Sequence, residues 1–556
     1  MNRLITLALL SSSAAMAQMS GPLVAEPAAM ATSDTFANIA ARGEANAFAP
    51  REFRESRSHE IPKATDDSAR ASLAGSIGLN VSVPASTVTT QTANYQPLGT
   101  SVAVNFEALG VGTPGFIISG APPDTTMGVS PTQIVQWVNS QIGIYNKAGV
   151  PLLPAPGFIQ GNQVWAALGA GSLCAQFNRG DPLVQYDRVA QRWILSQFAF
   201  NATNTNNAQC IAVSTTSNAL GSYVLYEYNF GNVLPDYGKL GIWPDAYYLT
   251  YNMFTNGASF AGGRACAYDR PRMIAGLSAL QICFNSTSRF SYLPADMDGT
   301  TPPPAGTPNY HISWDWAFFA APPYTMQLTK FVPNFLTPAL STFNDGFGGA
   351  PFSFVGFNLL GNTLAACNDN GNNCVAQLGT GQLLDTLGSR HMYRLVYRNF
   401  GGYDALLFTQ STDNSAGSTA ELRWWEIRSP GANAPVVYQN STYKPDSTAR
   451  WMGSAAFDKL GNIMIGYSTS SAASNPGIRM AGRRKTDPKN LLRTETTVIN
   501  GTGSQTTGLA RWGDYSTMQI DPADDCTFWY TTQYIGANGT FNWRTRVASI
   551  KFPNCN

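Results

Sequence analysis

Hydrophobic positions from about residue 96 onward form short runs instead of long periodic stretches. The runs are rich in aromatic and β-branched residues and are separated by Gly, Pro, Asn and Asp. Short alternating runs bounded by turn residues are typical of strands, whereas an amphipathic helix needs apolar positions every 3.6 residues over a longer stretch. The pattern therefore predicts an all-β chain with few helices.

One unit recurs along this part of the chain: a strand, a turn built on Asp or Pro, and a second strand. Copies lie at 128–139, 181–196, 243–250, 391–397, 451–467 and 512–530, with a weaker one at 310–314. Seven units over about 460 residues give roughly 65 residues each. Repeated antiparallel units favour a β-propeller over an array of β-sandwiches, which would need a linker about every 100 residues. We expect seven blades, with six as the alternative, and a ring closed by an early strand at 101–106.

The amino-terminal region differs from the rest. Basic Arg3 precedes an apolar run at 4–10, and Ala15-Met16-Ala17 is a small-x-small cleavage site, so 1–17 is predicted to be a signal peptide. The apolar run is shorter than the roughly 20 residues that span a bilayer, and we expect no membrane span. Residues 18–95 lack steady alternation and are expected to form a flexible leader or pro-segment before a propeller domain at 96–556. These features predict a secreted or periplasmic protein.

Cysteine use fits an oxidising compartment. All eight cysteines follow the cleavage site: Cys174, Cys210, Cys266, Cys283, Cys367, Cys374, Cys526 and Cys555. None forms a CxxC pair and the chain has three histidines, so zinc sites are not expected. Of the 105 pairings that eight cysteines allow, pairing nearest neighbours (174 with 210, 266 with 283, 367 with 374, 526 with 555) is the simplest. Each bridge would pin one local hairpin or loop.

The low net charge excludes some classes of partner, and two acidic or amide-rich loops are the candidates for a bound ion. Charged residues make up 12% of the chain and the net charge is +1, so nothing attracts nucleic acid or anionic lipid. Oxygen-rich loops at 368–373 and at Asp521, Asp524 and Asp525 lack EF-hand spacing, and such residues also form ordinary turns. We expect no cofactor, with structural calcium the one exception these loops allow.

Two stretches carry a resemblance to known proteins. They are Arg450-Trp451-Met452-Gly453-Ser454 with 457–462, and Arg511-Trp512-Gly513-Asp514-Tyr515-Ser516 with 521–530. They resemble a group of secreted bacterial β-propeller proteins, most without an assigned function, over residues 100 to 556, and more distantly the sialidase-like superfamily. The Asp-box of that superfamily, Ser-x-Asp-x-Gly-x-x-Trp, is only approximated at 458–462, which lacks the Ser and the Trp.

The resemblance implies a site where the first strands of the blades begin. By role, Arg390, Arg450 and Arg511 would clamp an acidic sugar, Asp124 or Asp245 would transfer the proton, and Tyr515 would be the nucleophile. Asp181, Asp514 and His391 would contribute to substrate binding. The alternative is structural, because Arg450 and Arg511 each precede a Trp and each arginine would then bridge to a neighbouring blade. Trp424 and Trp425 face opposite sides of a strand, so one is expected in the core and the other is a candidate for a glycan-binding surface, although sheet packing between blades is the commoner use of such residues.

These features predict a monomeric glycoside hydrolase that acts on an extracellular polysaccharide, an acidic one if the arginines clamp it. A non-catalytic propeller that binds glycan or protein at the cell surface is the alternative, and a secreted structural scaffold is a third reading. Serine–histidine catalysis is not expected, because no Gly-x-Ser-x-Gly elbow accompanies His311 or His391.

Overall fold

The computed structural model describes residues 19–42, 89–118, 120–287, 289–315, 325–345, 352–355, 373–388, 390–412, 419–431 and 435–556. The chain is all-β, as the sequence predicted. The helices in these ranges are short: α1 (Phe36–Ala41), α3 (Leu173–Gln176), α4 (Arg270–Ile274), η2 (Gly161–Leu168) and η4 (Pro338–Leu340). None of them is long and apolar enough to cross a bilayer. The expected signal peptide, His59, Cys367 and the loop at 368–372 lie outside the described residues.

The strands follow one another in antiparallel sets of four. The first set is β5 (Thr126–Val129), β6 (Gln133–Val138), β7 (Gln141–Asn146) and β8 (Phe158–Gln160). The second is β9 (Leu183–Asp187), β10 (Arg192–Phe200), β11 (Asn207–Ser214) and β12 (Tyr223–Gly231). The third is β13 (Val233–Ile242), β14 (Ala246–Thr255), β15 (Ser259–Asp269) and β16 (Gln281–Ser286). The fourth is β17 (Arg289–Asp298), β18 (Asn309–Asp315), β19 (Thr325–Val332) and β20 (Thr342–Asp345).

The later sets repeat this order. They are β24 (His391–Asn399), β25 (Asp404–Thr412), β26 (Glu421–Arg428) and β27 (Val436–Tyr443), then β28 (Ala449–Phe457), β29 (Ile463–Ser471), β30 (Ser474–Arg483) and β31 (Thr496–Ile499). The last is β32 (Thr517–Ile520), β33 (Thr527–Ile535) and β34 (Trp543–Lys551), completed by β4 (Val102–Glu107). Outside the sets, β21 (Phe352–Val355) pairs with β19, and β22 (Val375–Gln377) pairs with β23 (Thr380–Leu384).

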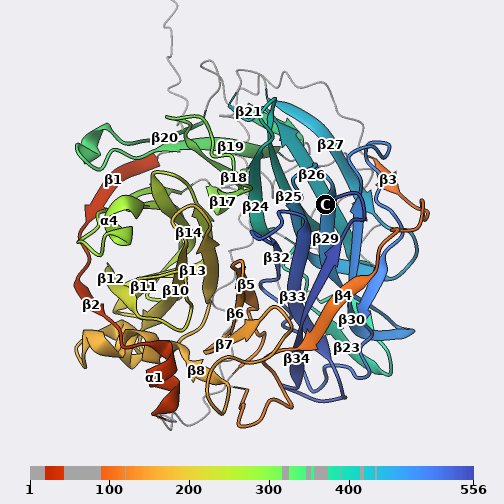
Figure 1. Ribbon diagram of the computed structural model, residues 1–556, viewed down its shortest axis with the longest axis horizontal. Coiled ribbons are helices and arrows are strands. Elements are labelled where there is room, and N and C mark those ends of the chain that lie inside the picture. Colours follow the sequence, from red (N-terminus) through yellow and green to blue (C-terminus); the bar gives the residue numbers. More distant parts are fainter. Residues whose placement is uncertain are drawn as a thin grey trace, which may run out of the picture.

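The first strands of the sets are neighbours in a closed cycle. β5 contacts β9, β9 contacts β13 and β13 contacts β17; β17 pairs in parallel with β24; β24 contacts β28, β28 contacts β32 and β32 contacts β5. In Figure 1, β5, β17, β24 and β32 lie near the middle of the molecule, and β12, β20 and β27 lie at its periphery. The copies at 128–139, 181–196, 451–467 and 512–530 fall on the first two strands of a set, whereas 243–250 covers the turn after β13 and part of β14, 391–397 lies within β24, and 310–314 lies within β18.

An early strand pairs with the last set, as the sequence predicted. β4 pairs antiparallel with β34, with Phe106 opposite Val547 and Val102 opposite Ile550. Along β4 the side chains alternate between half-buried and exposed, so Val102, Val104 and Phe106 face the core. The last set therefore takes its outer strand from the start of the chain.

The expectation of a flexible leader is wrong for its described residues. β1 (Met19–Ala25) adds a fifth strand to the third set, β2 (Ala29–Thr32) adds one to the second, and β3 (Thr90–Gln91) pairs in parallel with β27. Phe36 of α1 is fully buried and stacks on Tyr223 at 4.4 Å between ring centroids. Backbone pairing with open sheet edges supplies order that a weak hydrophobic pattern did not signal.

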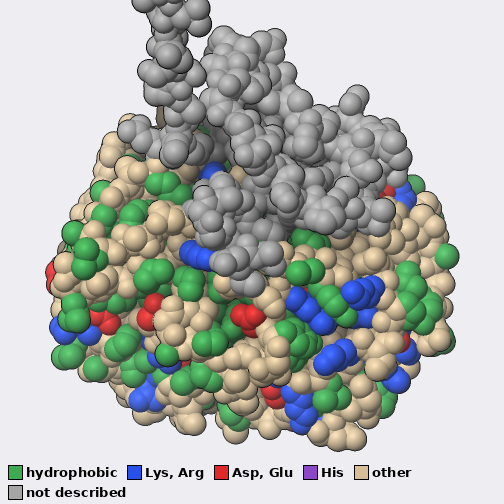
Figure 2. Space-filling model, turned by 90° about the horizontal axis from the view of Figure 1, so that it is seen from above, with side chains coloured by type: hydrophobic (Ala, Val, Ile, Leu, Met, Phe, Trp, Pro, Cys, Tyr) green, Lys and Arg blue, Asp and Glu red, His purple; other side chains and the backbone are tan. Residues whose placement is uncertain are grey.

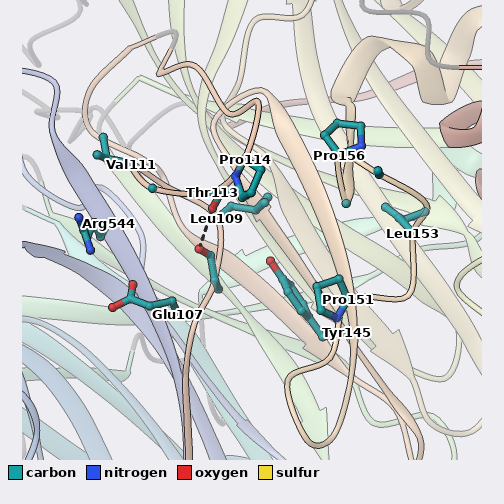
Figure 3. Close-up of a pocket in the computed structure, with 14 residues that line it drawn as sticks. Glu107, Leu109, Val111, Thr113, Pro114, Tyr145, Pro151, Leu153, Pro156 and Arg544 are labelled. Carbon is teal, nitrogen blue, oxygen red and sulfur yellow. Dashed lines mark hydrogen bonds between the residues drawn. The ribbon is translucent and has the colours of Figure 1, made fainter.

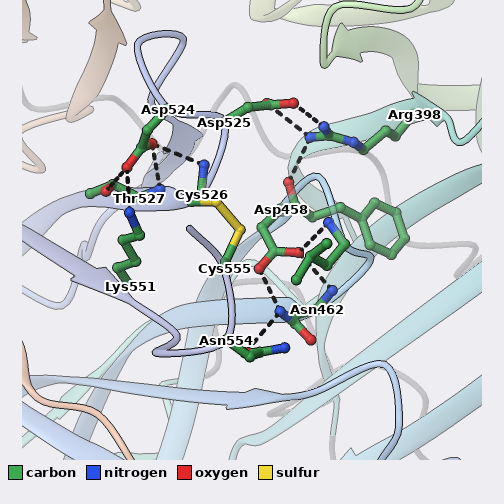
Figure 4. The surroundings of a disulfide bond; sticks show 12 residues. Arg398, Asp458, Asn462, Asp524, Asp525, Cys526, Thr527, Lys551, Asn554 and Cys555 are labelled. Atoms are coloured by element: carbon green, nitrogen blue, oxygen red, sulfur yellow. Dashed lines mark hydrogen bonds and ion pairs between the residues drawn. A yellow bond between two sulfur atoms is a disulfide. The ribbon is translucent and has the colours of Figure 1, made fainter.

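Three of the four expected disulfides are present: the first ties α3 to β11, the second joins β15 to β16, and the third lies at the end of the last set. They are Cys174–Cys210, Cys266–Cys283 and Cys526–Cys555. Cys374 is also disulfide-bonded, and its expected partner Cys367 is not among the described residues. The last bridge ties the turn before β33 to the carboxyl terminus (Figure 4).

The core continues on both faces of the sheets. Trp424 and Trp425 point to opposite sides of β26, yet both are buried, which corrects the interpretation of one as a candidate for a glycan-binding surface. Trp425 packs in the largest hydrophobic cluster and Trp424 in a separate one with Tyr467 of the next set. A sheet stacked between two others buries both its faces. The face seen in Figure 2 carries hydrophobic side chains and uncharged surface over most of its described part, with basic side chains more numerous on its right half and acidic ones scattered.

Candidate functional site

Each set has one non-glycine residue with a left-handed backbone at or near the start of its first strand. These residues are Asp124, Asp181, Tyr237, Ser291, Leu387, Met452 and Asp514, with φ between 45° and 57°. Such angles are uncommon in residues other than glycine, and cost about 1–3 kcal/mol unless the surroundings hold them. Four of these residues lie just before the first strand, and Tyr237, Ser291 and Met452 lie inside it at a shift in strand register. The seven include three of the aspartates that the sequence singled out.

Asp181 and Tyr515 form the centre of a group of side chains at these positions. The Tyr515 hydroxyl donates to Asp181 Oδ2 at 2.9 Å, and the Tyr237 backbone N–H donates to the same oxygen at 3.1 Å. The Tyr237 and Tyr515 rings stack at 5.6 Å. Asp181 comes from the second set, Tyr237 from the third and Tyr515 from the last, so three sets meet here.

Two cations lie against this pair of rings. The Lys239 ammonium is 3.1 Å from the Tyr237 centroid and 3.9 Å from that of Tyr515, and Lys239 is 1% exposed. The Arg390 guanidinium lies 4.7 Å from the Tyr237 centroid. We call Asp124, Asp181, Tyr237, Lys239, Arg390, Asp514 and Tyr515 the first-strand cluster.

Burial controls the protonation of the cluster. It raises the pKa of Tyr515 well above its usual value, and the neighbouring Asp181 and Asp124 carboxylates raise it further. It also lowers the pKa of Lys239 well below its usual value, although the Asp181 carboxylate opposes this. Tyr515 is therefore a neutral phenol at neutral pH, held by a carboxylate that accepts its hydrogen bond.

Two further predicted residues lie at the edge of the cluster. Arg511 forms an ion pair with Asp514, three residues along the chain, and both act electrostatically on Tyr237. Asp124 lies near enough to Tyr515 to raise its pKa, and its Oδ2 accepts a hydrogen bond from Asn139 at 3.3 Å. The structure thus brings together Asp124, Asp181, Arg390, Arg511, Asp514 and Tyr515.

Arg450 binds two acids that are not part of the cluster. Its guanidinium binds both Glu495 oxygens, at 2.9 and 3.0 Å, and both Asp446 oxygens, also at 2.9 and 3.0 Å. The guanidinium also lies 5.5 Å from the ring centroid of Tyr443 on β27, so the arginine contacts the preceding set, as the structural alternative expected. The neighbouring tryptophans also link two sets, because Trp451 and Trp512 pack at 5.5 Å and the Trp512 indole donates to Ser468.

Asp245 and His391 also lie apart from the cluster. Asp245 is in the turn between β13 and β14, beyond the end of β13, which lies five residues or roughly 16 Å along the strand from Tyr237. Its carboxylate accepts from the Tyr248 hydroxyl at 3.2 Å. His391 Nε2 lies 2.9 Å from the Met326 thioether, and burial lowers its pKa to about 3, so its ring is neutral. Neither environment is suited to binding a sugar.

Sequence reasoning missed Tyr237 and Lys239. The only signal was spacing, because Asp124, Asp181, Tyr237 and Ser291 follow at intervals of 54 to 57 residues. That interval is shorter than the 65 residues expected, and residue identity changes from one copy to the next. Because the residue type is not repeated at this position, the sequence does not identify Tyr237 as the third member of the series.

A second buried network crosses the middle of the molecule. Arg394 on β24 binds Asp296 and Asp298 on β17, and Arg398 binds Asp525 in the turn before β33. Arg188, after β9, reaches both Asp298 and Asp525. The cavity that remains around Arg394 has a volume of about 10 Å³, too small for a sugar.

The aspartates of the 521–525 turn have cationic partners. Asp521 pairs with Lys147 at 2.6 Å, Asp524 with Lys551 at 3.1 Å, and Asp525 with Arg398 (Figure 4). Asp524 also accepts from the backbone of Cys526 and Thr527, as a turn former does. No group of metal-ligand side chains occurs in the part of the chain that the structure describes.

Comparison with known proteins gives likeness at the level of solved structures only. No protein-family model matches the chain, and no curated protein matches it. Penicillium chrysogenum α-L-arabinanase is 7% identical, with a TM-score of 0.35, over 82% of this chain and 100% of that one. The GH93 α-L-arabinofuranosidase of Fusarium graminearum is 8% identical, with a TM-score of 0.35, over 81% and 99%.

Trypanosoma rangeli sialidase is 8% identical, with a TM-score of 0.30, over 67% of this chain and 54% of that one. At these values the likeness carries no argument about activity. What the chain does therefore has to follow from its own residues.

Proposed function

We propose that this chain is a secreted or periplasmic seven-bladed β-propeller that acts on an acidic carbohydrate at the first-strand cluster. The observation that carries the proposal is the Tyr515–Asp181 hydrogen bond at 2.9 Å, with the Lys239 ammonium against the tyrosine ring. A phenol held by a carboxylate can act as a nucleophile at a sugar, and tyrosine takes that role in some glycosidases. Three disulfides fit the oxidising compartment.

The blade count is supported by two independent regularities. The first strands contact one another in a cycle that closes from β32 to β5. One left-handed residue also lies near the start of every first strand. A six-bladed ring would leave one of these strands and one of these residues without a place in the cycle.

The proposed reaction uses four side chains. Asp181 takes the proton of Tyr515 as the phenolic oxygen attacks the anomeric carbon, and the protonated Asp124 gives its proton to the departing sugar oxygen. Water, which gives a proton to the Asp124 carboxylate, then attacks the anomeric carbon and releases the sugar, and Asp181 returns the proton to the Tyr515 oxygen. Arg390 provides positive charge for a carboxylate on the substrate, because guanidinium groups bind carboxylates through paired hydrogen bonds. Of the two acids the sequence offered for proton transfer, Asp245 lies at the far end of β13, which leaves Asp124.

The alternative is a propeller that binds an acidic glycan without cleaving it. The pairing of Arg450 and Arg511 with acids favours this reading, because two of the three arginines expected to clamp the substrate are held by acids of the chain itself. The raised pKa of Tyr515 also favours it, since a neutral phenol is a weak nucleophile until its proton is removed.

The test is to incubate the mature protein with neutral and uronate-containing oligosaccharides and to follow products and binding separately. Tyr515→Phe removes the hydroxyl and Asp181→Asn removes the charge. Tyr223→Phe is the matched control, because its buried hydroxyl donates to a carbonyl at 3.0 Å in the second set. We expect both cluster variants to lower kcat on acidic substrates by about 100-fold or more, and the control to leave it unchanged.

Binding of acidic oligosaccharide without products from the wild-type protein would replace the enzyme with the binding module. Equal turnover by Tyr515→Phe and the wild-type protein would contradict the proposed nucleophile. Absence of both binding and turnover across the panel would contradict a carbohydrate function.

A further inference from the structure

A separate cavity lies where the first and last sets meet. It has a volume of about 510 Å³, within the range of small-molecule sites, and its walls come from the 107–114 and 151–157 segments with Tyr145 and Arg544 (Figure 3). It shares no lining residue with the first-strand cluster. Its occupant would therefore differ from the carbohydrate proposed above.

Rings of fixed shape form much of the wall. Pro114, Pro151 and Pro156 line the cavity together with Leu109 and Leu153. Proline rings lock their backbone, and the 113–116 turn is held by a hydrogen bond from the Phe116 N–H to the Thr113 carbonyl at 3.0 Å. The cavity thus offers a preformed, flat and largely apolar surface, which suits an apolar ring better than a hydroxyl-covered sugar.

Tyr145 points a polar group into this apolar space. It is 4% exposed, its ring packs on Phe106 at 5.2 Å, and its hydroxyl is directed toward the middle of the cavity (Figure 3). Among the described residues none hydrogen bonds with this hydroxyl. Burial alone raises its pKa, so the group is a neutral O–H donor that lacks an acceptor. A ligand oxygen placed in the cavity would supply one.

Arg544 supplies positive charge at the opposite side. Its guanidinium lies close to Gly112 and Gly536, where a Cβ would come within 3.8 Å of Cζ and 2.8 Å of Nε respectively. No described carboxylate forms an ion pair with it, whereas Glu107 forms an ion pair with Arg546 at 2.6 Å. A guanidinium next to an apolar cavity is a ready partner for a ligand carboxylate.

We propose that this cavity binds a small aromatic carboxylate whose ring packs between the prolines. Its carboxylate meets Arg544, and an ether or hydroxyl oxygen at the other end of the ring accepts from Tyr145. The ligand needs a negative charge, a flat apolar ring and an oxygen at the far end of the ring. Each of these three requirements comes from a different part of the cavity wall.

The experiment measures binding of 4-methoxycinnamate to the mature protein by calorimetry, beside its methyl ester and glucuronate. We expect Arg544→Gln to weaken binding at least about tenfold and Tyr145→Phe about threefold or more. Arg479→Gln and Tyr186→Phe, which change the same residue types elsewhere, are the matched controls and should stay within about twofold. Thermal unfolding of each variant establishes that it is folded.

Weaker binding of the ester and of glucuronate would support the roles of charge and of the apolar ring. Equal binding of acid and ester, or tighter binding of glucuronate, would overturn the ligand class. Failure of the wild-type protein to bind 4-methoxycinnamate at about 10 mM would overturn the site.

Discussion

At the scale of single residues, the chain places unusual backbone angles where its polar side chains gather. Asp124, Asp181 and Asp514 all have left-handed angles, and so do Tyr237 and Met452, whose bulk makes that conformation rarer still. Such residues persist only when their surroundings hold them. Asp181 is held in this way, because its carboxylate binds both the Tyr237 N–H and the Tyr515 hydroxyl.

Residue type predicted part of this site and not the rest. Charged residues just before a first strand were visible in the sequence, and six of the nine named binding or catalytic residues lie together. The prediction for Arg450 failed because its guanidinium forms ion pairs with Asp446 and Glu495, and sequence order cannot show these contacts. Lys239 was missed because a buried lysine is rare and nothing in its neighbours signals burial.

Asp245 makes a prediction for stability against pH. Burial raises its pKa to about 6, although the Tyr248 hydrogen bond opposes this, while an unfolded Asp has a pKa of about 3.9. The native state therefore binds the proton more tightly than the unfolded state. Its stabilising contribution is full below about pH 3.9 and is lost as the pH rises through about 6.

Asp245→Asn cannot ionise and should escape that loss. We expect the free energy of unfolding of the variant, relative to wild type, to rise by about 2–3 kcal/mol between about pH 4 and pH 8. Urea unfolding at both pH values measures it. A difference between variant and wild type that does not change with pH would contradict the raised pKa.

At the scale of elements, an aspartate that accepts hydrogen bonds in the turn after a first strand explains why the repeat could be seen in the sequence. Asp187 Oδ1 accepts from the Val189 and Ala190 N–H groups after β9, and Asp458 Oδ1 accepts from Leu460 and Asn462 after β28. An aspartate that bonds its own backbone two to four residues on favours a turn. The Asp-box likeness at 458–462 is thus a turn former that works without the Ser and Trp.

Strand β4 was also predicted, because it alternates clearly, whereas β1 and β2 were not. Their side chains are half-buried or exposed, and they are held by pairing with β16 and β12. Backbone hydrogen bonds carry no sequence pattern, so an added edge strand is hard to find from the sequence.

Phe106 tests whether β4 closes the cycle between the last and first sets. Its ring packs on Tyr145 and lies where a Cβ on Gly149 would be 2.5 Å away. We expect Phe106→Ala to lower the free energy of unfolding by about 2–3 kcal/mol, less than a fully buried Phe because the residue is half-buried. Urea unfolding provides the measurement.

Ala103→Ser on the exposed side of the same strand is the matched control, expected within about 0.5 kcal/mol of wild type. Equal stability of the two variants would mean that β4 adds little to the closure.

At the scale of the whole molecule, the cycle of first strands brings together residues far apart in the sequence. Asp181 and Tyr515 are separated by 334 positions, and Arg188 and Asp525 by 337. One contact belongs to the first-strand cluster and the other to the ion network that crosses the middle. The fold class followed from local strand and turn patterns, but these contacts depend on the closed cycle, which local patterns do not encode.

The most direct test of the account is the position of a bound acidic oligosaccharide in a crystal structure. Crystals of Asp181→Asn, soaked with a uronate-containing oligosaccharide that the protein binds in solution, would show where it lies. The account predicts density at the first-strand cluster, with the carboxylate on Arg390 and a sugar ring beside Tyr515. Density at another face of the molecule, with the cluster unchanged, would contradict it.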